Sequence, residues 1–322
     1  MPASPSPCPL SGTAARLRAA GCVFAEEEAR LLISAARTPA ELAAMTGRRA
    51  AGVPLEHVLG WAEFCGLRIA VDPGVFVPRR RTEFLVRQAA SLGCRAAAHA
   101  RQPAAPAGPA AGRAGHAAAT SRATCPGGQA PAIPSQAGVP GGQVPGRPGI
   151  VVDLCCGSGA VGAALAAALG PVELHAADID PAAVACARRN VADAGGQVHE
   201  GDLYEPLPAV LAGRVGILAA NVPYVPAAEV GLLPPEARDH EARVALDGGA
   251  DGLDVLRRVA AAAPLWLAPG GSLLAETSER QASRAAGILA RAGLIAQVAR
   301  CGELNATVVI GTKPSGPGDS AY

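Results

Sequence analysis

The chain has 322 residues, of which 50% are hydrophobic and only 3% are aromatic, so its core must be built mainly from small aliphatic side chains. Its 28 Lys and Arg residues against 27 Asp and Glu residues give a net charge of +1, which argues against a protein that follows nucleic-acid phosphates along a strongly basic face. The nine cysteines are odd in number and contain no C-x-x-C pair, which argues against a disulfide framework or a zinc site. We therefore expect no bound metal.

The beginning of the chain carries no recognisable targeting signal. Residues 1–10 contain four prolines and lack the charged region and apolar run of a secretory signal peptide. The longest apolar stretches, such as residues 160–169, are much shorter than the roughly 20 residues that span a bilayer. We therefore expect a cytoplasmic protein with no membrane partner.

The first 78 residues predict a helical domain followed by a hairpin. Apolar residues recur at helical spacing over 13–20, 25–36 and 39–46, so we expect residues 1–60 to form a small helical domain. From residue 61 to residue 78 the pattern changes to short β-type runs, with strands over 64–71 and 75–77 and a turn at 72–74. We expect this segment to be a β-hairpin that links two domains.

A second domain begins at residues 79–94 and is then interrupted. Residues 95–148 are rich in Ala, Pro and Gly and contain no acidic residue, no Leu and no aromatic residue. Such a segment buries too little apolar surface to offset the entropy lost on ordering. We therefore predict a disordered insertion over 95–148.

After the insertion, strands alternate with helices. We expect helices over 160–169, 181–194, 253–262 and 279–292, and strands over 150–154, 173–177, 215–220, 271–276, 295–300 and 306–311, with a further strand before residue 201. This alternation predicts a doubly wound, Rossmann-like α/β domain over 149–312 and leaves 313–322 as a tail. In such a sheet the ligand binds at the carboxyl ends of the strands.

The first strand of this domain ends in a glycine-rich loop. Gly157, Gly159 and Gly162 satisfy G-x-G-x-x-G, and Asp178 at the end of the next strand is positioned to accept hydrogen bonds from ribose hydroxyls. Taken alone, the pattern fits a dinucleotide such as NAD as well as it fits S-adenosylmethionine. The residues that we assign to this loop are Asp153, Cys155, Cys156, Gly157, Ser158 and Gly159.

Two further strand ends carry polar groups. Asp202, followed by Leu203, is a candidate acceptor for an adenine amino group. The strand over 215–220 ends in Asn221-Val222-Pro223-Tyr224. A planar NH₂ group is a poor nucleophile because its lone pair is delocalised, so it must be held against the electrophile. The Asn221 side-chain oxygen and the Val222 carbonyl can accept its two protons while the Tyr224 ring packs against its plane.

These motifs together resemble the protein-(glutamine-N(5)) methyltransferases of release factors, the HemK/PrmC family. Further stretches that match the family are residues 54–60 with 63–67, residues 77–79 with 82–83, residues 245–253, and residues 269–271 with Glu276 and Gln281. The resemblance covers nearly the whole chain apart from its two ends and the predicted insertion.

The resemblance implies an S-adenosylmethionine-dependent methyltransferase that modifies the glutamine of a Gly-Gly-Gln loop in a peptide chain release factor. By resemblance the cofactor is bound by the loop from Cys155 to Gly159, by Asp178, by Asp202 with Leu203, and by Asn221. The resemblance also assigns catalysis to Asn221, Val222, Pro223 and Tyr224, and it implies that residues 1–60 dock the substrate.

Three departures from the family pattern suggest a divergent subgroup. Cys155 stands where the loop usually begins with glycine, and Val222 stands where the family has proline. The segment from Arg79 to Glu83 has Arg80 and Arg81 where the family usually has Pro and an acid. We expect these two arginines to add charge near the substrate entrance.

Other functions remain open at this stage. The motif from Asn221 to Tyr224 also suits a methyltransferase acting on adenine or cytosine amino groups, although the near-neutral charge argues against a nucleic-acid partner. A catalytically idle module that binds a release factor is a second alternative. A nicotinamide dehydrogenase is disfavoured because nothing after Asp178 supplies acid–base chemistry for hydride transfer.

Overall fold

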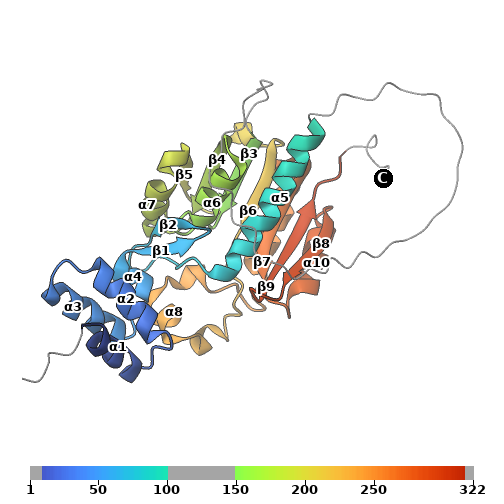
Figure 1. Cartoon of the computed structure of the whole chain (residues 1–322). Helices are drawn as coiled ribbons and strands as arrows, with labels where there is room; N and C mark the ends of the chain where they lie inside the picture. The colour runs from blue at the N-terminus through green and yellow to red at the C-terminus, as the bar shows by residue number, and fades with distance from the viewer. Residues whose placement is uncertain (1–8, 101–148, 316–322) are drawn as a thin grey trace, which may run out of the picture.

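The computed structural model describes residues 9–100 and 149–315 (Figure 1). Helix α5 (Glu83–Ala100) continues through residues 95–100, so the predicted start of the insertion falls inside a helix. The remainder of that predicted insertion, and most of the predicted tail, lie outside the described residues. None of the helices within the described ranges has the length and apolar character of a bilayer-spanning segment.

Four helices form the N-terminal part of the molecule: α1 (Pro9–Ala19), α2 (Ala25–Ala35), α3 (Pro39–Ala50) and α4 (Leu55–Leu59). Leu17, Leu32 and Val58 are among the buried side chains that they share. Helix α3 begins as expected for its sequence, with Pro39 in the first turn and the Thr38 hydroxyl accepting a hydrogen bond from the Glu41 amide at 3.1 Å. The three predicted helices are confirmed, and the single-turn α4 is additional.

The hairpin consists of β1 (Trp61–Phe64) and β2 (Leu67–Ala70), which pair antiparallel with Phe64 opposite Leu67. Its turn is therefore Cys65-Gly66, and the predicted strand over 75–77 is not formed. The predicted turn at 72–74 is present, with the Val75 amide donating to the Asp72 carbonyl at 3.1 Å, but it follows β2 and does not join the two strands. Both turn residues have positive φ, 51° at Cys65 and 75° at Gly66, as the tight turns that match strand twist require. Pro73 has its φ fixed near −65° by its ring and cannot supply that geometry.

The C-terminal part is built on a seven-stranded sheet with the order β5-β4-β3-β6-β7-β9-β8. The first five of these strands run parallel, while β9 is antiparallel to both β7 and β8. The doubly wound α/β fold is thereby confirmed. The strands are β3 (Gly149–Leu154), β4 (Val172–Asp178), β5 (Gln197–Glu200), β6 (Val215–Ala220), β7 (Leu267–Thr277), β8 (Ile295–Cys301) and β9 (Ala306–Thr312).

Alternate side chains of the strands build one core on each face of the sheet. Val151 of β3 belongs to the core shared with α5 and with α6 (Ala160–Leu169), whereas its neighbour Val152 belongs to the core shared with α9 (Asp254–Trp266) and α10 (Ala282–Arg291). Helix α7 (Pro181–Asn190) packs on the α5 side; it ends four residues before the predicted boundary, and a short 3₁₀ turn follows over Ala192–Ala194.

A long connection joins β6 to α9 and contains α8 (Pro235–His240). It reaches back toward the N-terminal part, because Glu241 pairs with Gly74 in an isolated bridge and the Ala242 amide donates to the Gly74 carbonyl at 3.1 Å. Figure 1 shows the hairpin β1–β2 between the N-terminal helices and the sheet, with α8 beside those helices.

One arginine joins the two parts electrostatically. The Arg49 guanidinium, on α3, donates two hydrogen bonds to the Glu28 carboxylate, at 2.6 and 3.1 Å, and lies 2.6 Å from the Glu236 carboxylate on α8. The Arg49 and Glu28 side chains are only 9% and 11% exposed. Removing one member of a buried pair leaves the other charge uncompensated.

We expect Arg49→Met to lower the free energy of unfolding by about 3–5 kcal/mol, because it leaves Glu28 buried without a counter-charge. The matched control is Arg37→Met, whose partner Glu41 forms an exposed pair and whose loss should cost about 1 kcal/mol or less. Urea denaturation of both variants measures the difference. Equal stabilities for the two variants would contradict the importance of burial here.

Candidate active site

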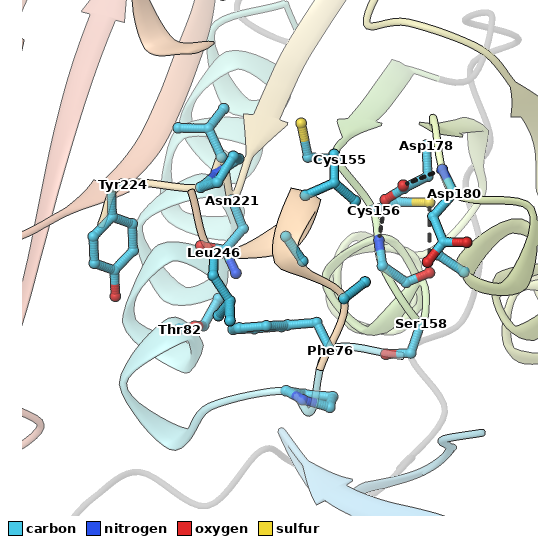
Figure 2. A pocket seen from close by; sticks show the side chains of 18 of the residues that line it. Phe76, Thr82, Cys155, Cys156, Ser158, Asp178, Asp180, Asn221, Tyr224 and Leu246 are labelled. Atoms are coloured by element: carbon cyan, nitrogen blue, oxygen red, sulfur yellow. Dashed lines mark hydrogen bonds between the residues drawn. The ribbon is translucent and has the colours of Figure 1, made fainter. Parts of the chain in front are cut away.

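A cavity of about 380 Å³ opens at the carboxyl ends of β3, β4 and β6. The predicted site residues line it with the exception of Gly159. Gly159 instead begins α6 with a φ of 76°, and a side chain there would meet Ala187 at 3.0 Å. Figure 2 shows Asn221 and Tyr224 on one side of the cavity and Asp178, Cys156 and Ser158 on the other, with Phe76 between them.

The glycine-rich loop contains left-handed residues and is hydrogen-bonded to the neighbouring strand β4. Cys155 and Gly157 have φ values of 53° and 54°. The Cys156 amide donates to the Ala177 carbonyl at 3.1 Å, and the Gly157 amide donates to Asp178 Oδ2 at 2.8 Å. Cys155 therefore takes the backbone conformation that glycine adopts more easily. Burial raises the pKa of its thiol well above the ordinary range, so the thiol stays protonated and unreactive.

Asp178 combines a structural role with exposure to the cavity. Besides Gly157, it accepts a hydrogen bond from the Asp180 amide at 3.0 Å. Burial raises the pKa of Asp178 above its usual value, while these two amides favour the ionised form. An ionised carboxylate accepts from several donors at once, so Asp178 retains the capacity for ribose hydroxyls that the sequence analysis assigned to it.

Asp153 offers an acceptor that no other group in the described part of the chain uses. The residue is fully buried, its Oδ2 accepts from the Gly162 amide at 2.8 Å, and its Oδ1 has no hydrogen-bond partner. Burial raises the pKa of Asp153 to about 7. An unpartnered buried oxygen facing a cavity calls for a donor from a ligand. S-adenosylmethionine carries an ammonium group, so the residues present fit the expected cofactor.

Asp202 has a partner that the sequence analysis did not identify. Arg258, on α9, donates to Asp202 Oδ2 at 2.6 Å, and both residues line the cavity. This leaves Oδ1 for the adenine amino group predicted above. Leu203 follows with a φ of 51°, a conformation rare for a branched residue. Because Arg258 follows Asp202 by 56 residues and lies on a helix, no local spacing indicated the pair.

Asn190 connects the glycine-rich loop to the hairpin, and it too was missed. Its side-chain nitrogen donates to the Ser158 carbonyl at 2.8 Å and to the Ala70 carbonyl at 2.9 Å, while its oxygen accepts from the Ala70 amide at 2.9 Å. One amide thus satisfies backbone groups of two segments that meet only in the folded chain. No sequence signal indicated this role, because Asn190 lies inside the predicted helix over 181–194 and becomes a helix end only in the structure.

The backbone that follows Asn221 is fixed by the segment 245–253. The Val225 amide donates to the Leu246 carbonyl at 3.1 Å, and the Gly248 amide donates to the Val225 carbonyl at 2.8 Å. The Gln281 side chain donates to the Tyr224 carbonyl at 2.9 Å. At Gly252, with a φ of 76°, a Cβ atom would lie 2.3 Å from that same carbonyl oxygen. This close approach explains why glycine occupies the position.

Arg81 lines the cavity, as expected from the sequence, but its charge is paired with a buried acid. Its Nε donates to Glu276 at 2.9 Å and its Nη2 donates to the Tyr224 hydroxyl at 2.8 Å. Arg80 is exposed and does not line the cavity. The sequence showed the arginines but not the buried acid that one of them contacts.

Comparison with known proteins identifies a family model and several relatives. Residues 143–226 match the methyltransferase small domain family. The chain is 35% identical over 260 residues to a release factor glutamine methyltransferase of Geobacter sulfurreducens, covering 79% of this chain and 72% of that protein. It is 31% identical over 237 residues to a release factor glutamine methyltransferase of Streptomyces coelicolor, covering 74% and 67%. It is 41% identical over 129 residues to a ribosomal protein uL3 glutamine methyltransferase of Bordetella pertussis, covering 39% and 42%.

We expect Gly252→Ala to lower the free energy of unfolding more than Gly293→Ala does. Both glycines have positive φ, 76° and 83°, but only a Cβ at Gly252 meets other atoms within 4 Å. Gly293→Ala should therefore cost about 1–2 kcal/mol for the left-handed conformation alone, whereas Gly252→Ala adds a clash with Tyr224. Thermal or urea unfolding of both variants provides the measurement, and equal losses would contradict the close approach.

The ionisation of Asp153 predicts a pH dependence of cofactor binding. Because its pKa is raised to about 7, the carboxylate is protonated in mild acid and becomes charged as the pH rises. We expect affinity for S-adenosylmethionine to increase between about pH 5.5 and about pH 7.5, by at most about tenfold per pH unit. Asp153→Asn should bind more weakly and lose most of this dependence. Calorimetry measures both, and an unchanged slope in the variant would rule out Asp153 as the origin.

Proposed function

Since the chain belongs to the release factor glutamine methyltransferase family, we propose that it transfers a methyl group from S-adenosylmethionine to the side-chain amide nitrogen of a protein glutamine. The substrate that we propose is the glutamine of the Gly-Gly-Gln loop in a peptide chain release factor. The observation that carries this proposal is the shared cavity, which is lined both by the loop from Cys155 to Ser158 and by Asn221 and Tyr224.

The chemistry that these residues can perform is orientation of a weak nucleophile. When bound, S-adenosylmethionine supplies an electrophilic methyl group on a positively charged sulfur. The Asn221 side-chain oxygen and the Val222 carbonyl accept the two protons of the substrate amide, and the Tyr224 ring packs against the amide plane. Acceptors at these protons also favour the nitrogen as it becomes positive. Val222 serves as well as the usual proline, because only its backbone carbonyl is needed.

The extent of the matches favours a release factor over a ribosomal protein as the substrate. Similarity to the uL3 enzyme covers 39% of this chain, whereas similarity to the Geobacter enzyme covers 79% of it. We propose that the helices α1–α4 contact the release factor and that the hairpin presents it to the cavity. Because release factors act on ribosomes, we also propose a cytoplasmic location.

The direct test is methylation of a purified release factor with labelled S-adenosylmethionine, followed by mass mapping of the Gly-Gly-Gln peptide. We expect one methyl group on the glutamine. An unmodified glutamine under conditions where calorimetry shows cofactor binding would reject the proposed substrate. DNA, ribosomal RNA and protein uL3 serve as alternative substrates in parallel reactions, and preferential labelling of any of them would redirect the assignment.

In the same assay we expect Asn221→Ala to lower kcat by about 100-fold or more, because an amide that loses one of its acceptors is no longer held against the methyl group. The control is the dissociation constant for S-adenosylmethionine, which should change far less than kcat because, although Asn221 is also expected to contact the cofactor, the loop from Cys155 to Ser158, Asp178 and Asp202 remain. Turnover close to that of the unaltered protein would exclude the proposed amide clamp.

A further inference from the structure

A buried carboxylate lies behind the Tyr224 ring. Glu276 is at the end of β7 and is only 2% exposed. Its Oε2 accepts a hydrogen bond from the Thr82 hydroxyl at 2.6 Å, and its Oε1 accepts from Arg81 Nε at 2.9 Å and from the Tyr224 hydroxyl at 3.0 Å. Three donors from two distant segments of the chain therefore converge on one carboxylate.

The arrangement fixes the Tyr224 hydroxyl from two sides. That hydroxyl donates to Glu276 and accepts from Arg81 Nη2 at 2.8 Å. A hydroxyl that both donates and accepts in this way is held in position, and since it is attached directly to the ring, the ring direction is held with it. Arg81 also supplies the positive charge without which a buried carboxylate would be strongly destabilising.

The sheet places Glu276 where it can do this. Strands β6 and β7 are parallel, with Ala220 opposite Ala275, so Glu276 lies one residue beyond the last pair and beside the beginning of the motif at Asn221. The Tyr224 backbone is held separately by Gln281. The backbone and the ring of the same tyrosine thus have independent supports.

We propose that Glu276 is a positioning residue for methyl transfer, acting through the Tyr224 hydroxyl, and that Arg81 is its obligatory counter-charge. This inference rests on the proposed function, in which the Tyr224 ring packs against the substrate amide. A ring free to swing away would leave the amide without its stacking partner, and the nitrogen would spend less time in line with the methyl group.

Arg81 is also the point at which this chain departs from the pattern that it resembles. That pattern usually has an acid at this position, and an acid here would place a second carboxylate beside Glu276. In this chain the guanidinium uses two of its nitrogens to contact both Glu276 and Tyr224. A lysine has one nitrogen and could not reproduce both contacts with the same geometry.

The test separates a positioning role from a purely structural one by comparing Glu276→Gln, Tyr224→Phe and the double variant. If Glu276 acts through the hydroxyl, each single variant should lower kcat by about tenfold, and the double variant should be no slower than the slower single variant. The dissociation constant for S-adenosylmethionine should stay within about twofold in all three. Losses that multiply in the double variant would overturn the proposal.

Tyr224→Phe and two further variants, Arg81→Lys and Arg81→Gln, keep the test decisive if Glu276→Gln folds poorly. Tyr224→Phe keeps the ring and removes only the hydroxyl, so an unchanged kcat for this variant alone would overturn the proposal. Arg81→Lys should retain more activity than Arg81→Gln, because it keeps the positive charge beside Glu276. Equal activities for these two variants would contradict the role of Arg81 as the counter-charge.

A measurement that needs no substrate distinguishes failure of this inference from failure of the proposed function. Burial and the nearby Glu276 charge raise the pKa of Tyr224. Replacing Glu276 by glutamine should also shift the near-ultraviolet absorbance of Tyr224 at neutral pH, because its hydroxyl no longer donates to a charged acceptor, with Tyr224→Phe identifying its signal. An unchanged spectrum would reject the contact. A shifted spectrum in a protein that methylates no release factor would keep the contact and reject only the substrate.

Discussion

The parallel pairing of β3 with β6 is the constraint on which the site depends. Their register places Leu154 opposite Ala220, so the loop that begins at Cys155 and the motif that begins at Asn221 leave the sheet at adjacent points. The next strand after β3 lies on its other side, which makes this pair the switch point of the sheet. Loops there diverge to opposite faces and leave a crevice between them. The two halves of the site therefore meet because of strand order.

Two buried carboxylates then hold the linker that follows the hairpin across this crevice. Glu241 accepts from the Val77 amide at 3.1 Å and from Arg79 at 2.6 Å, and Glu276 accepts from Thr82 and Arg81. Each acid belongs to the C-terminal part and each donor to the linker. A buried carboxylate without partners is strongly destabilising. Moving the linker, from Val77 to Thr82, away from the C-terminal part would therefore leave both acids without their donors. The cavity wall and the domain connection are therefore one structure.

The sequence predicted those parts of the arrangement that depend on residues close together in the chain. The strand over 215–220 was predicted with its observed bounds, since a continuous apolar run between turn residues marks a buried parallel strand. The cavity residues followed from strand ends for the same reason. The contacts that were missed, such as Arg258 with Asp202 and Arg81 with Glu276, join residues 56 and 195 positions apart. Tertiary packing determines these pairs. The Cys65-Gly66 turn was missed because the residues at 72–74 form a stronger turn signal nearby.

The same long-range pairs compensate the positive charges that line the cavity. Among the described residues, the three arginines that line the cavity each contact an acid: Arg79 with Glu241, Arg81 with Glu276 and Arg258 with Asp202. A guanidinium that binds a phosphate group tightly needs its donors free to engage the anion. Here each guanidinium already donates to a carboxylate of the protein, which compensates its charge, and the proposed amide position is faced by an aromatic ring with carbonyl and carboxamide oxygens. Such a surface suits a neutral NH₂ group, whose protons need acceptors and whose plane needs a flat apolar partner.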